Sequence, residues 1–141
     1  MNQRTARSVA AVFSGFLCIA GSSGPSKKDI GLKLASRKEC GVAQHSLCAE
    51  LCFTITNHSE QRLTWAEFDV IGRVPGGSRE CRFYVDPTGT RLPTTNIPVA
   101  PHRAREECFS GAFWHWDGCH AVTEIEAQVT EAKFEGEAVS H

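Results

Sequence analysis

The sequence lacks a charge excess, a long apolar run and any internal repeat. Lys and Arg number 15 against 16 Asp and Glu, so the basic footprint of a nucleic-acid-binding protein is missing and no nucleic-acid partner is expected. No apolar stretch reaches the roughly 20 residues that a membrane-spanning helix requires, so we expect no transmembrane anchor in the mature chain. The length fits one domain with a modest core.

The motifs that usually mark an enzyme are also absent. The chain has no Gly-x-Ser-x-Gly, His-Glu-x-x-His, glycine-rich phosphate loop or Cys-x-x-Cys. Glu106 and Glu107 are adjacent, so in a strand they point to opposite faces. Glu124 and Glu126 share a face, which is ordinary for a solvated strand. The sequence therefore predicts neither catalytic residues nor a cofactor, and a hydrolase of unrecognised type is kept as an alternative.

The N-terminus has the pattern of a signal peptide. Arg4 and Arg7 form a positive region without acidic residues, and an apolar run of about 13 residues follows, Ser8–Ala20. That run suits a signal peptide and is too short to cross a bilayer. The tripeptide that ends at Ala20 is a small-x-small cleavage site. A buried N-terminal helix is the alternative interpretation.

These observations predict the domain organisation and the location. We expect a signal peptide over residues 1–20, a flexible leader over 21–29, a folded domain over 30–135 and a frayed tail over 136–141. Cleavage would leave 13 basic against 16 acidic residues, a net charge of −3. The protein is predicted to be exported, to a periplasm or the extracellular space.

Cysteine usage supports export independently. The chain has seven cysteines, and cleavage would remove Cys18. The six that remain are Cys40, Cys48, Cys52, Cys81, Cys108 and Cys119. An even number in a small exported domain predicts three disulfides, and six cysteines allow 15 pairings. A zinc site is the alternative, but no second close pair follows Cys48 and Cys52.

Alternation of apolar and polar residues is clearest over Leu47–Thr56. Leu47, Ala49, Leu51, Phe53 and Ile55 share one face, which is typical of a half-buried strand. Cys48 and Cys52 then lie on the outer face with Cα atoms about 13 Å apart, too far for a disulfide. Each is expected to find its partner on a neighbouring strand or loop.

Shorter strands are expected on either side of that segment. They cover residues 30–36, 63–71, 81–86, 96–99 and 105–110, and Asp86–Gly89 has the composition of a turn. The segment Ala121–Phe134 fits a strand by alternation and a helix by the spacing of Val122, Ile125, Val129 and Ala132. Its Val and Thr content favours the strand. About seven short antiparallel strands predict an all-β sandwich stapled by disulfides.

Several short motifs resemble the immunoglobulin-like β-sandwich domains of exported and cell-envelope proteins. They are Leu51–Ser59, Phe68–Val70, Phe83–Gly89 and Ile97–Pro101, within a region that runs from about residue 47 to 134. The resemblance implies a domain that binds a partner or supports assembly. The Cys-Trp-Cys spacing of antibody domains is not clearly present, so no closer family is indicated.

The most unusual segment runs from Phe113 to His120. Trp114, His115, Trp116 and Asp117 form a candidate binding loop, because exposed aromatic residues give large contact areas at low entropic cost. In the alternative interpretation, the two tryptophans pack over a disulfide of Cys119. A metal site is a further alternative, with His115 and His120 as ligands beside Asp117 and a Cys119 thiolate.

Two other patterns complete the picture. Asn57-His58-Ser59 matches the N-glycosylation sequon, although a polar turn explains the same residues. The segment from Glu124 to Glu137 is acidic and could face a basic surface. The sequence thus predicts an exported, non-catalytic binding or accessory protein that contacts a protein partner through its loops. A periplasmic metal-binding protein is the main alternative.

Overall fold

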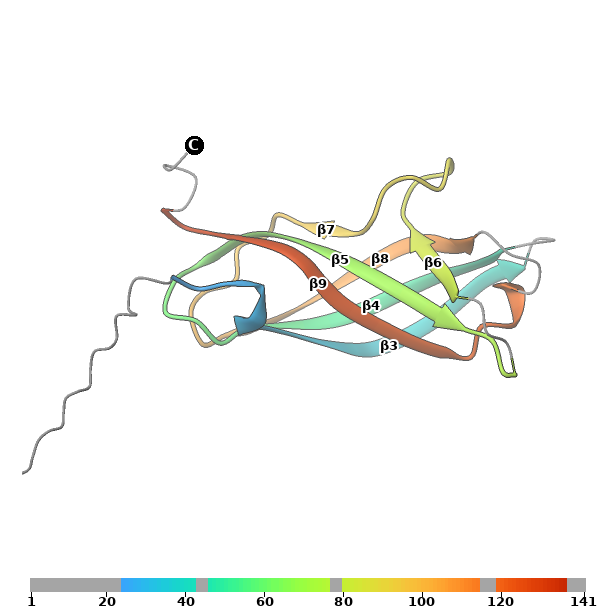
Figure 1. Cartoon of the computed structure of the whole chain (residues 1–141), viewed down its shortest axis with the longest axis horizontal. Helices are drawn as coiled ribbons and strands as arrows, with labels where there is room; N and C mark the ends of the chain where they lie inside the picture. The colour runs from blue at the N-terminus through green and yellow to red at the C-terminus, as the bar shows by residue number, and fades with distance from the viewer. Residues whose placement is uncertain (1–23, 43–45, 77–79, 115–118, 137–141) are drawn as a thin grey trace, which may run out of the picture.

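The computed structural model describes residues 24–42, 46–76, 80–114 and 119–136 (Figure 1). The predicted signal peptide lies outside these residues. Seven strands form the fold: β3 (Ile30–Val42), β4 (Leu47–Asn57), β5 (Leu63–Arg73), β6 (Glu80–Tyr84), β7 (Thr94–Thr95), β8 (Ala104–Trp114) and β9 (Glu124–Phe134). Two short 3₁₀ turns, η1 (Lys27–Asp29) and η2 (Cys119–Ala121), precede β3 and β9.

All strand pairs are antiparallel and belong to one sheet. The order is β3-β4-β8-β6-β5-β7, and β9 pairs with β5 along most of its length. The sheet curls into a half-barrel, so β5 and β9 cross in front of β3, β4 and β8 (Figure 1). The predicted all-β class, with seven antiparallel strands, is confirmed, whereas a two-sheet sandwich is not.

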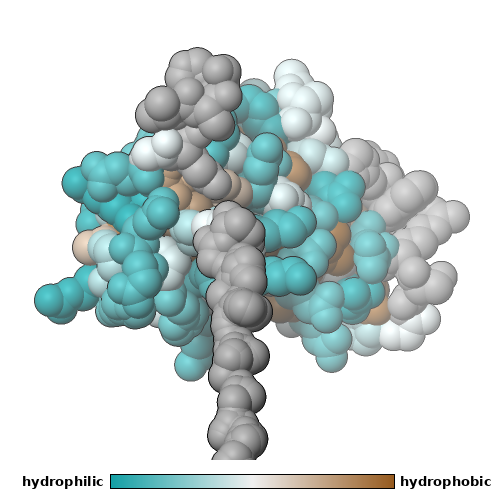
Figure 2. Space-filling model, turned by 60° about the vertical axis from the view of Figure 1, so that its left-hand side comes forward, coloured by the Kyte–Doolittle hydropathy of each residue, from teal (hydrophilic) through white to brown (hydrophobic). Residues whose placement is uncertain are grey.

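The core lies inside this curl. The five apolar residues that the sequence placed on the inner face of β4 are at most 1% exposed, which confirms that prediction. The largest fully buried side chains are those of Phe53, Phe68, Phe83, Phe113 and Phe134. The face seen in Figure 2 is largely hydrophilic, with apolar residues visible only in small patches. The alternation along the strands thus separates core from solvent.

Several strands differ in extent from the prediction. β3 and β8 are longer than expected, because their later residues pair with β4 despite weak alternation. The predicted extended segment 96–99 makes only one bridge, between Val99 and Leu63, and the short β7 lies just before it. The segment after Ala121 forms β9, which confirms the strand rather than the helix.

A β-bulge interrupts β9 at Thr130. Phe68 of β5 pairs with Val129, but the preceding Glu67 pairs with Glu131, so Thr130 is the extra residue. A bulge of this kind shifts the alternation of side chains by one position. Consequently Ala127 and Val129 pack on the core before the bulge, and Ala132 and Phe134 pack on it afterwards.

The two end strands of the curled sheet, β3 and β9, lie close together. No backbone ladder joins them among the pairings of the described residues. Side chains bridge the segments around this gap: Arg37 Nη2 of β3 donates to the carbonyl of Val122, just before β9, at 2.6 Å. Lys27 Nζ of η1 donates to the carbonyl of Thr130 in β9 at 3.4 Å. Arg37 pairs in register with the buried Leu51, which places its side chain on the inner face. We call this gap the β3–β9 seam.

Three disulfides pair all six cysteines that the sequence singled out. They join Cys40 to Cys48, Cys52 to Cys108 and Cys81 to Cys119. The first two tie β4 to its neighbours β3 and β8, and the third ties β6 to η2. Cys48 and Cys52 therefore bond to neighbouring strands and not to each other, as predicted. No helix within the described residues has the length and apolar character needed to cross a membrane.

Candidate functional site

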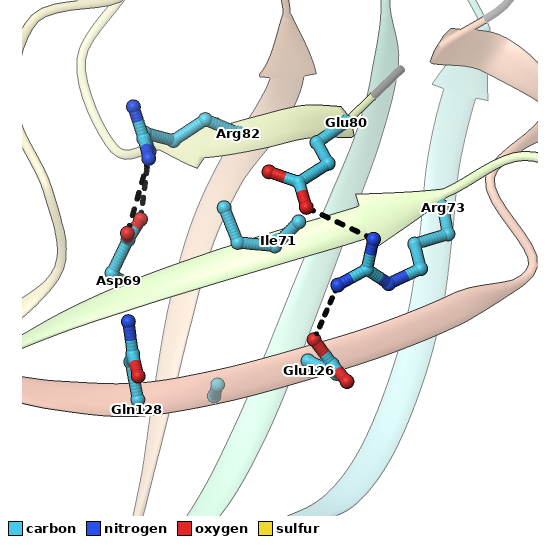
Figure 3. Close-up of a pocket in the computed structure, with 8 residues that line it drawn as sticks. Asp69, Ile71, Arg73, Glu80, Arg82, Glu126 and Gln128 are labelled. Atoms are coloured by element: carbon cyan, nitrogen blue, oxygen red, sulfur yellow. Dashed lines mark hydrogen bonds and ion pairs between the residues drawn. The ribbon is translucent and has the colours of Figure 1, made fainter. Parts of the chain in front are cut away.

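An open polar groove of about 600 Å³ lies on the outer face of β5, β6 and β9. Its polar lining residues are Asp69, Arg73, Glu80, Arg82, Glu126 and Gln128. Their side chains point outward because alternate residues of β5, Phe68 and Val70, are buried in the core. We call this surface the outer groove (Figure 3).

Arg73 joins all three strands of the outer groove. Its guanidinium donates to Glu126 of β9 at 2.7 Å and to Glu80 of β6 at 2.9 Å. The hydrogen bond to Glu126, followed by that to Glu80, raises the pKa of Arg73 above its ordinary value. Because all three side chains are well exposed, these ion pairs fix orientation more than they stabilise the fold.

Arg82 and Asp69 form the second ion pair of the groove. Nε of Arg82 lies 2.7 Å from one carboxylate oxygen and Nη2 lies 3.1 Å from the other, which is a bidentate arrangement. The hydrogen bond to Asp69 raises the pKa of Arg82. Ile71 lies between the two ion-paired groups and supplies the apolar floor between them (Figure 3).

The outer groove is lined mainly by charged groups. Two guanidinium groups and three carboxylates give the ion-paired set a net charge of −1. Both raised pKa values keep the arginines charged, so neither can exchange a proton near neutral pH. The carboxylate oxygens retain lone pairs for donors of a partner. The groove therefore presents two guanidinium groups and three carboxylates in ion-paired positions.

Trp114 is the predicted binding residue that the structure describes, and it borders this surface. It pairs in register with Arg82 on the neighbouring strand, so both lie on the outer face. A Cβ on Gly89 would lie 3.6 Å from its indole ring, which places the turn after β6 against that ring. The indole Nε1 is buried, without a hydrogen-bond partner among the described residues. The Trp114 side chain is thus half-buried rather than fully exposed to solvent.

The rest of the predicted binding loop lies outside the described residues. This applies to His115, Trp116 and Asp117, so the proposed contact loop and the His115–His120 metal site stay predictions. His120 is exposed in η2. The neighbouring Cys119 is fully buried in its disulfide with Cys81, so it cannot serve as a thiolate ligand.

The turn beside Trp114 is organised by Asp86, as its composition indicated. The carboxylate accepts hydrogen bonds from the hydroxyl of Thr88, from the backbone N–H and hydroxyl of Thr90, and from the backbone N–H of Arg91. These bonds, led by that from Thr88, hold the pKa of Asp86 well below its ordinary value. Gly89 supplies the positive φ of 70° that the turn needs. The carboxylate is therefore used to fix the loop.

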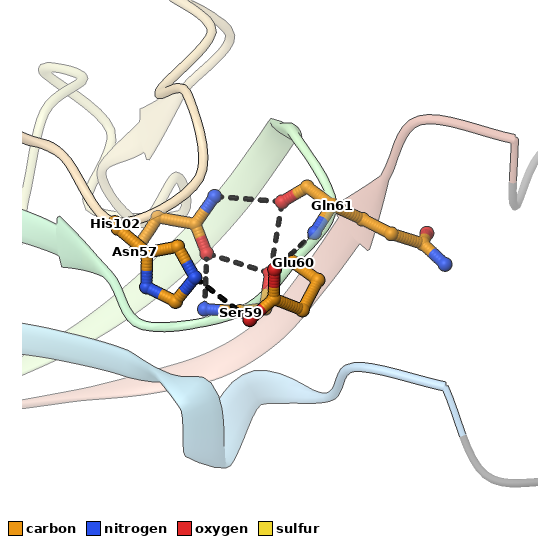
Figure 4. A network of polar contacts seen from close by, with 5 residues as sticks. All are labelled: Asn57, Ser59, Glu60, Gln61 and His102. Carbon is orange, nitrogen blue, oxygen red and sulfur yellow. Dashed lines mark hydrogen bonds and ion pairs between the residues drawn. The ribbon is translucent and has the colours of Figure 1, made fainter. Parts of the chain in front are cut away.

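The sequon asparagine, Asn57, is fully buried at the end of β4, where it takes part in a network of polar contacts (Figure 4). Its Nδ2 donates to the carbonyls of Gln61 at 2.7 Å and Val99 at 3.0 Å, while its Oδ1 accepts from the N–H and hydroxyl of Ser59. Nearby, His102 contacts Glu60 at 2.8 Å. A glycan needs the same Nδ2 atom, so these residues act as a turn in the folded chain.

The outer groove was not identified from the sequence. Its residues are spread over three strands that are separated along the chain, and only the register of β5 with β6 and β9 brings them together. The strand expected over residues 63–71 ended before Arg73, and its alternation named no partner for Asp69. Comparison with models of protein families, with curated proteins and with solved structures finds no match to this chain.

Proposed function

We propose that this chain is an exported, non-catalytic binding or accessory protein of the cell envelope or extracellular space. It contacts a protein partner through the outer groove and the loop that follows Trp114. The observation that carries the proposal is the fixed pattern of two arginines and three carboxylates on an open surface beside a half-buried tryptophan.

Preorganised charge suits recognition of a protein surface. Side chains already held by ion pairs lose little conformational entropy when a partner binds. Arg and Trp are also the residue types that most often dominate binding energy in interfaces. An interface that spans the groove and Trp114 would place the apolar Ile71 between charged groups, which is the usual arrangement of an apolar centre and a polar rim.

Export and an immunoglobulin-like architecture belong to the same proposal. Three disulfides in a small domain are typical of oxidising compartments, and they support the location that the N-terminal pattern predicts. The all-β antiparallel fold is compatible with the binding and assembly roles that the resemblance implies.

The test uses one charge reversal in the groove and one outside it. Glu126→Lys places a cation beside Arg73, whereas Glu50→Lys changes an exposed acid on the outer face of β4, which β8 and β6 separate from the groove. Partner proteins are first captured from the exported fraction of the native host, and the purified partner is then titrated against each variant by calorimetry.

We expect binding to the unaltered chain and to Glu50→Lys, and at least a tenfold loss with Glu126→Lys, which corresponds to about 1.4 kcal/mol. Hydrogen exchange of the complex should show protection on β5, β6 and β9. Equal affinity for both variants, or protection confined to other strands, would reject the proposed surface.

A further inference from the structure

The disulfide between Cys52 and Cys108 has one accessible sulfur. The two residues are directly opposite each other on β4 and β8, with Cα atoms 3.9 Å apart. Cys52 is 6% exposed, whereas Cys108 is exposed on the outer face. The carboxylate of Glu106, two residues earlier on the same face of β8, is also exposed, and its oxygen and both sulfurs lie within 4.8 Å of one another.

The strands that this disulfide joins are held together without it. Ten consecutive register pairs link β4 to β8, from Leu47 with Phe113 to Thr56 with Ala104. On the inner face, Leu51 and Phe53 are fully buried beside the disulfide. Opening the bond therefore leaves the backbone ladder and the core contacts in place, so the two sulfurs stay close together after reduction.

We propose that the Cys52–Cys108 disulfide is a reducible bond whose dithiol form, together with Glu106, binds a soft divalent cation of the zinc class. A tetrahedral zinc ion with Zn–S bonds of about 2.3 Å needs two sulfurs about 3.8 Å apart. Opposed cysteines on adjacent strands can supply this separation. The carboxylate gives a third ligand of a type that zinc accepts, and water completes the shell.

The chemistry begins at the exposed sulfur. A thiolate of a dithiol reductant attacks Sγ of Cys108, the S–S bond breaks, and Cys52 leaves as a thiolate that takes up a proton. The second thiol of the reductant attacks the mixed disulfide and releases Cys108, so the reductant ends as a disulfide and two electrons reach the protein. Metal binding then displaces the protons of both thiols to solvent.

The other two disulfides differ in ways that allow a test. Cys81 and Cys119 are buried at 2% and 0% exposure, so a reductant reaches neither sulfur. Cys40 is exposed, but no His, Asp or Glu completes a three-ligand group with it among the described residues. Only the Cys52–Cys108 pair combines an accessible sulfur with an adjacent carboxylate within that part of the chain.

The experiment uses the double variant Cys40→Ser, Cys48→Ser, so that a single accessible disulfide remains. The chain is treated with a mild dithiol under native conditions, the reductant is removed without oxygen, and thiols are mapped by alkylation and mass spectrometry. Zinc binding is measured by calorimetry and cadmium binding by its thiolate charge-transfer absorbance. Glu106→Gln removes the third ligand, and Glu50→Gln on the outer face of β4 is the matched control.

Among the cysteines that form disulfides, we expect alkylation of Cys52 and Cys108 only. We also expect an unchanged near-ultraviolet circular dichroism spectrum and one zinc per chain. Glu106→Gln should weaken zinc binding on the order of tenfold or more, as loss of groups that support a metal site commonly does, while Glu50→Gln should not. Unfolding on reduction, absence of metal binding, or equal affinity of the two Gln variants would overturn the proposal.

If the double variant does not fold, the unaltered chain gives the same answer. After native reduction, zinc should protect Cys52 and Cys108 from alkylation and leave Cys40 and Cys48 reactive. Protection of Cys40 and Cys48 to the same degree would overturn the proposal, because it would show that Glu106 adds nothing.

Discussion

Arg82 on β6 binds the carboxylate of Asp69 on β5, its diagonal neighbour, and not the residue directly opposite, which is Ile71. The diagonal lets the guanidinium reach both carboxylate oxygens across the ladder. Arg73 also binds a diagonal neighbour, but on the strand at the other side of β5. Its partner Glu126 lies on β9, directly opposite Ile71. One apolar residue thus sits between two diagonal ion pairs.

The coupling between Arg82 and Asp69 can be measured directly. We expect Arg82→Ala and Asp69→Asn each to lower the free energy of unfolding, and a double-mutant cycle to give about 0.5–1 kcal/mol of coupling, because the pair is bidentate but Arg82 is 42% exposed. Urea denaturation of the four chains supplies the numbers. If the two losses in the free energy of unfolding simply add, the ion pair orients the two side chains without stabilising the fold.

Asn57→Ala should strongly destabilise the domain. The change removes all four hydrogen bonds of a fully buried amide. It leaves the N–H of Ser59 without the partner it has in the fold, while the carbonyl of Val99 keeps only the N–H of Leu63. We expect a loss of about 2–4 kcal/mol in the free energy of unfolding. The exposed Asn96→Ala is the control and should change stability by less than about 0.5 kcal/mol. Similar values for both variants would contradict the role assigned to Asn57.

Asp86 predicts a dependence of stability on pH. Its folded pKa lies below the ordinary 3.8 of an unfolded aspartate, so the ionised carboxylate stabilises the turn above about pH 4. This stabilisation is lost as the pH falls below that value toward the folded pKa. Asp86→Asn should therefore be less stable than the unaltered chain at pH 7, and the difference should shrink in thermal melts recorded at decreasing pH. A constant difference down to pH 2 would contradict the assignment.

Gly111 is required by close packing against a backbone atom. An ideal Cβ at this position would lie 2.1 Å from the carbonyl oxygen of Tyr84, which cannot move independently of β6. Gly111→Ala should thus push β8 away from β6 and cost about 1–3 kcal/mol, the usual price of overpacking. Gly24→Ala, which meets no atom within 4 Å, is the control. The melting temperatures of Gly111→Ala and Gly24→Ala are the measurement. Equal melting temperatures would show that β8 can shift away from β6 without loss of stability.

Local alternation predicted most of the strands, but it missed the short β7 and did not give the arrangement of the strands. Residues 47–56 alternate strictly, and the inner face of β4 follows directly. The helical spacing seen after Ala121 has a physical cause: the bulge at Thr130 places Val129 and Ala132 three residues apart on the same face. Apolar residues in this segment therefore follow strand spacing before the bulge and helical spacing across it. Local residue preferences alone do not distinguish such an irregular strand from a helix.

The outer groove could not be predicted, because the pairing between distant strands cannot be read from the sequence. Disulfide pairing and the outer groove both follow from register between strands that are distant along the chain, such as β6 with β8 or β5 with β9. Aromatic content drew attention to Trp114, and the structure places that residue at the border of the groove. The charges of Asp69, Glu80 and Arg82 look like any solvated surface until their neighbours are known.

The β3–β9 seam has a consequence for association between molecules. An unpaired strand edge is normally a template on which another chain can add a strand, and inward-pointing charges are one way in which proteins block this. Here the two unpaired edges lie close together, and Arg37 of β3 donates to the carbonyl of Val122 where the chain enters β9. A foreign strand must displace that arginine and separate β3 from β9 before it can pair. Growth of an edge-to-edge fibre is therefore coupled to opening of the half-barrel itself.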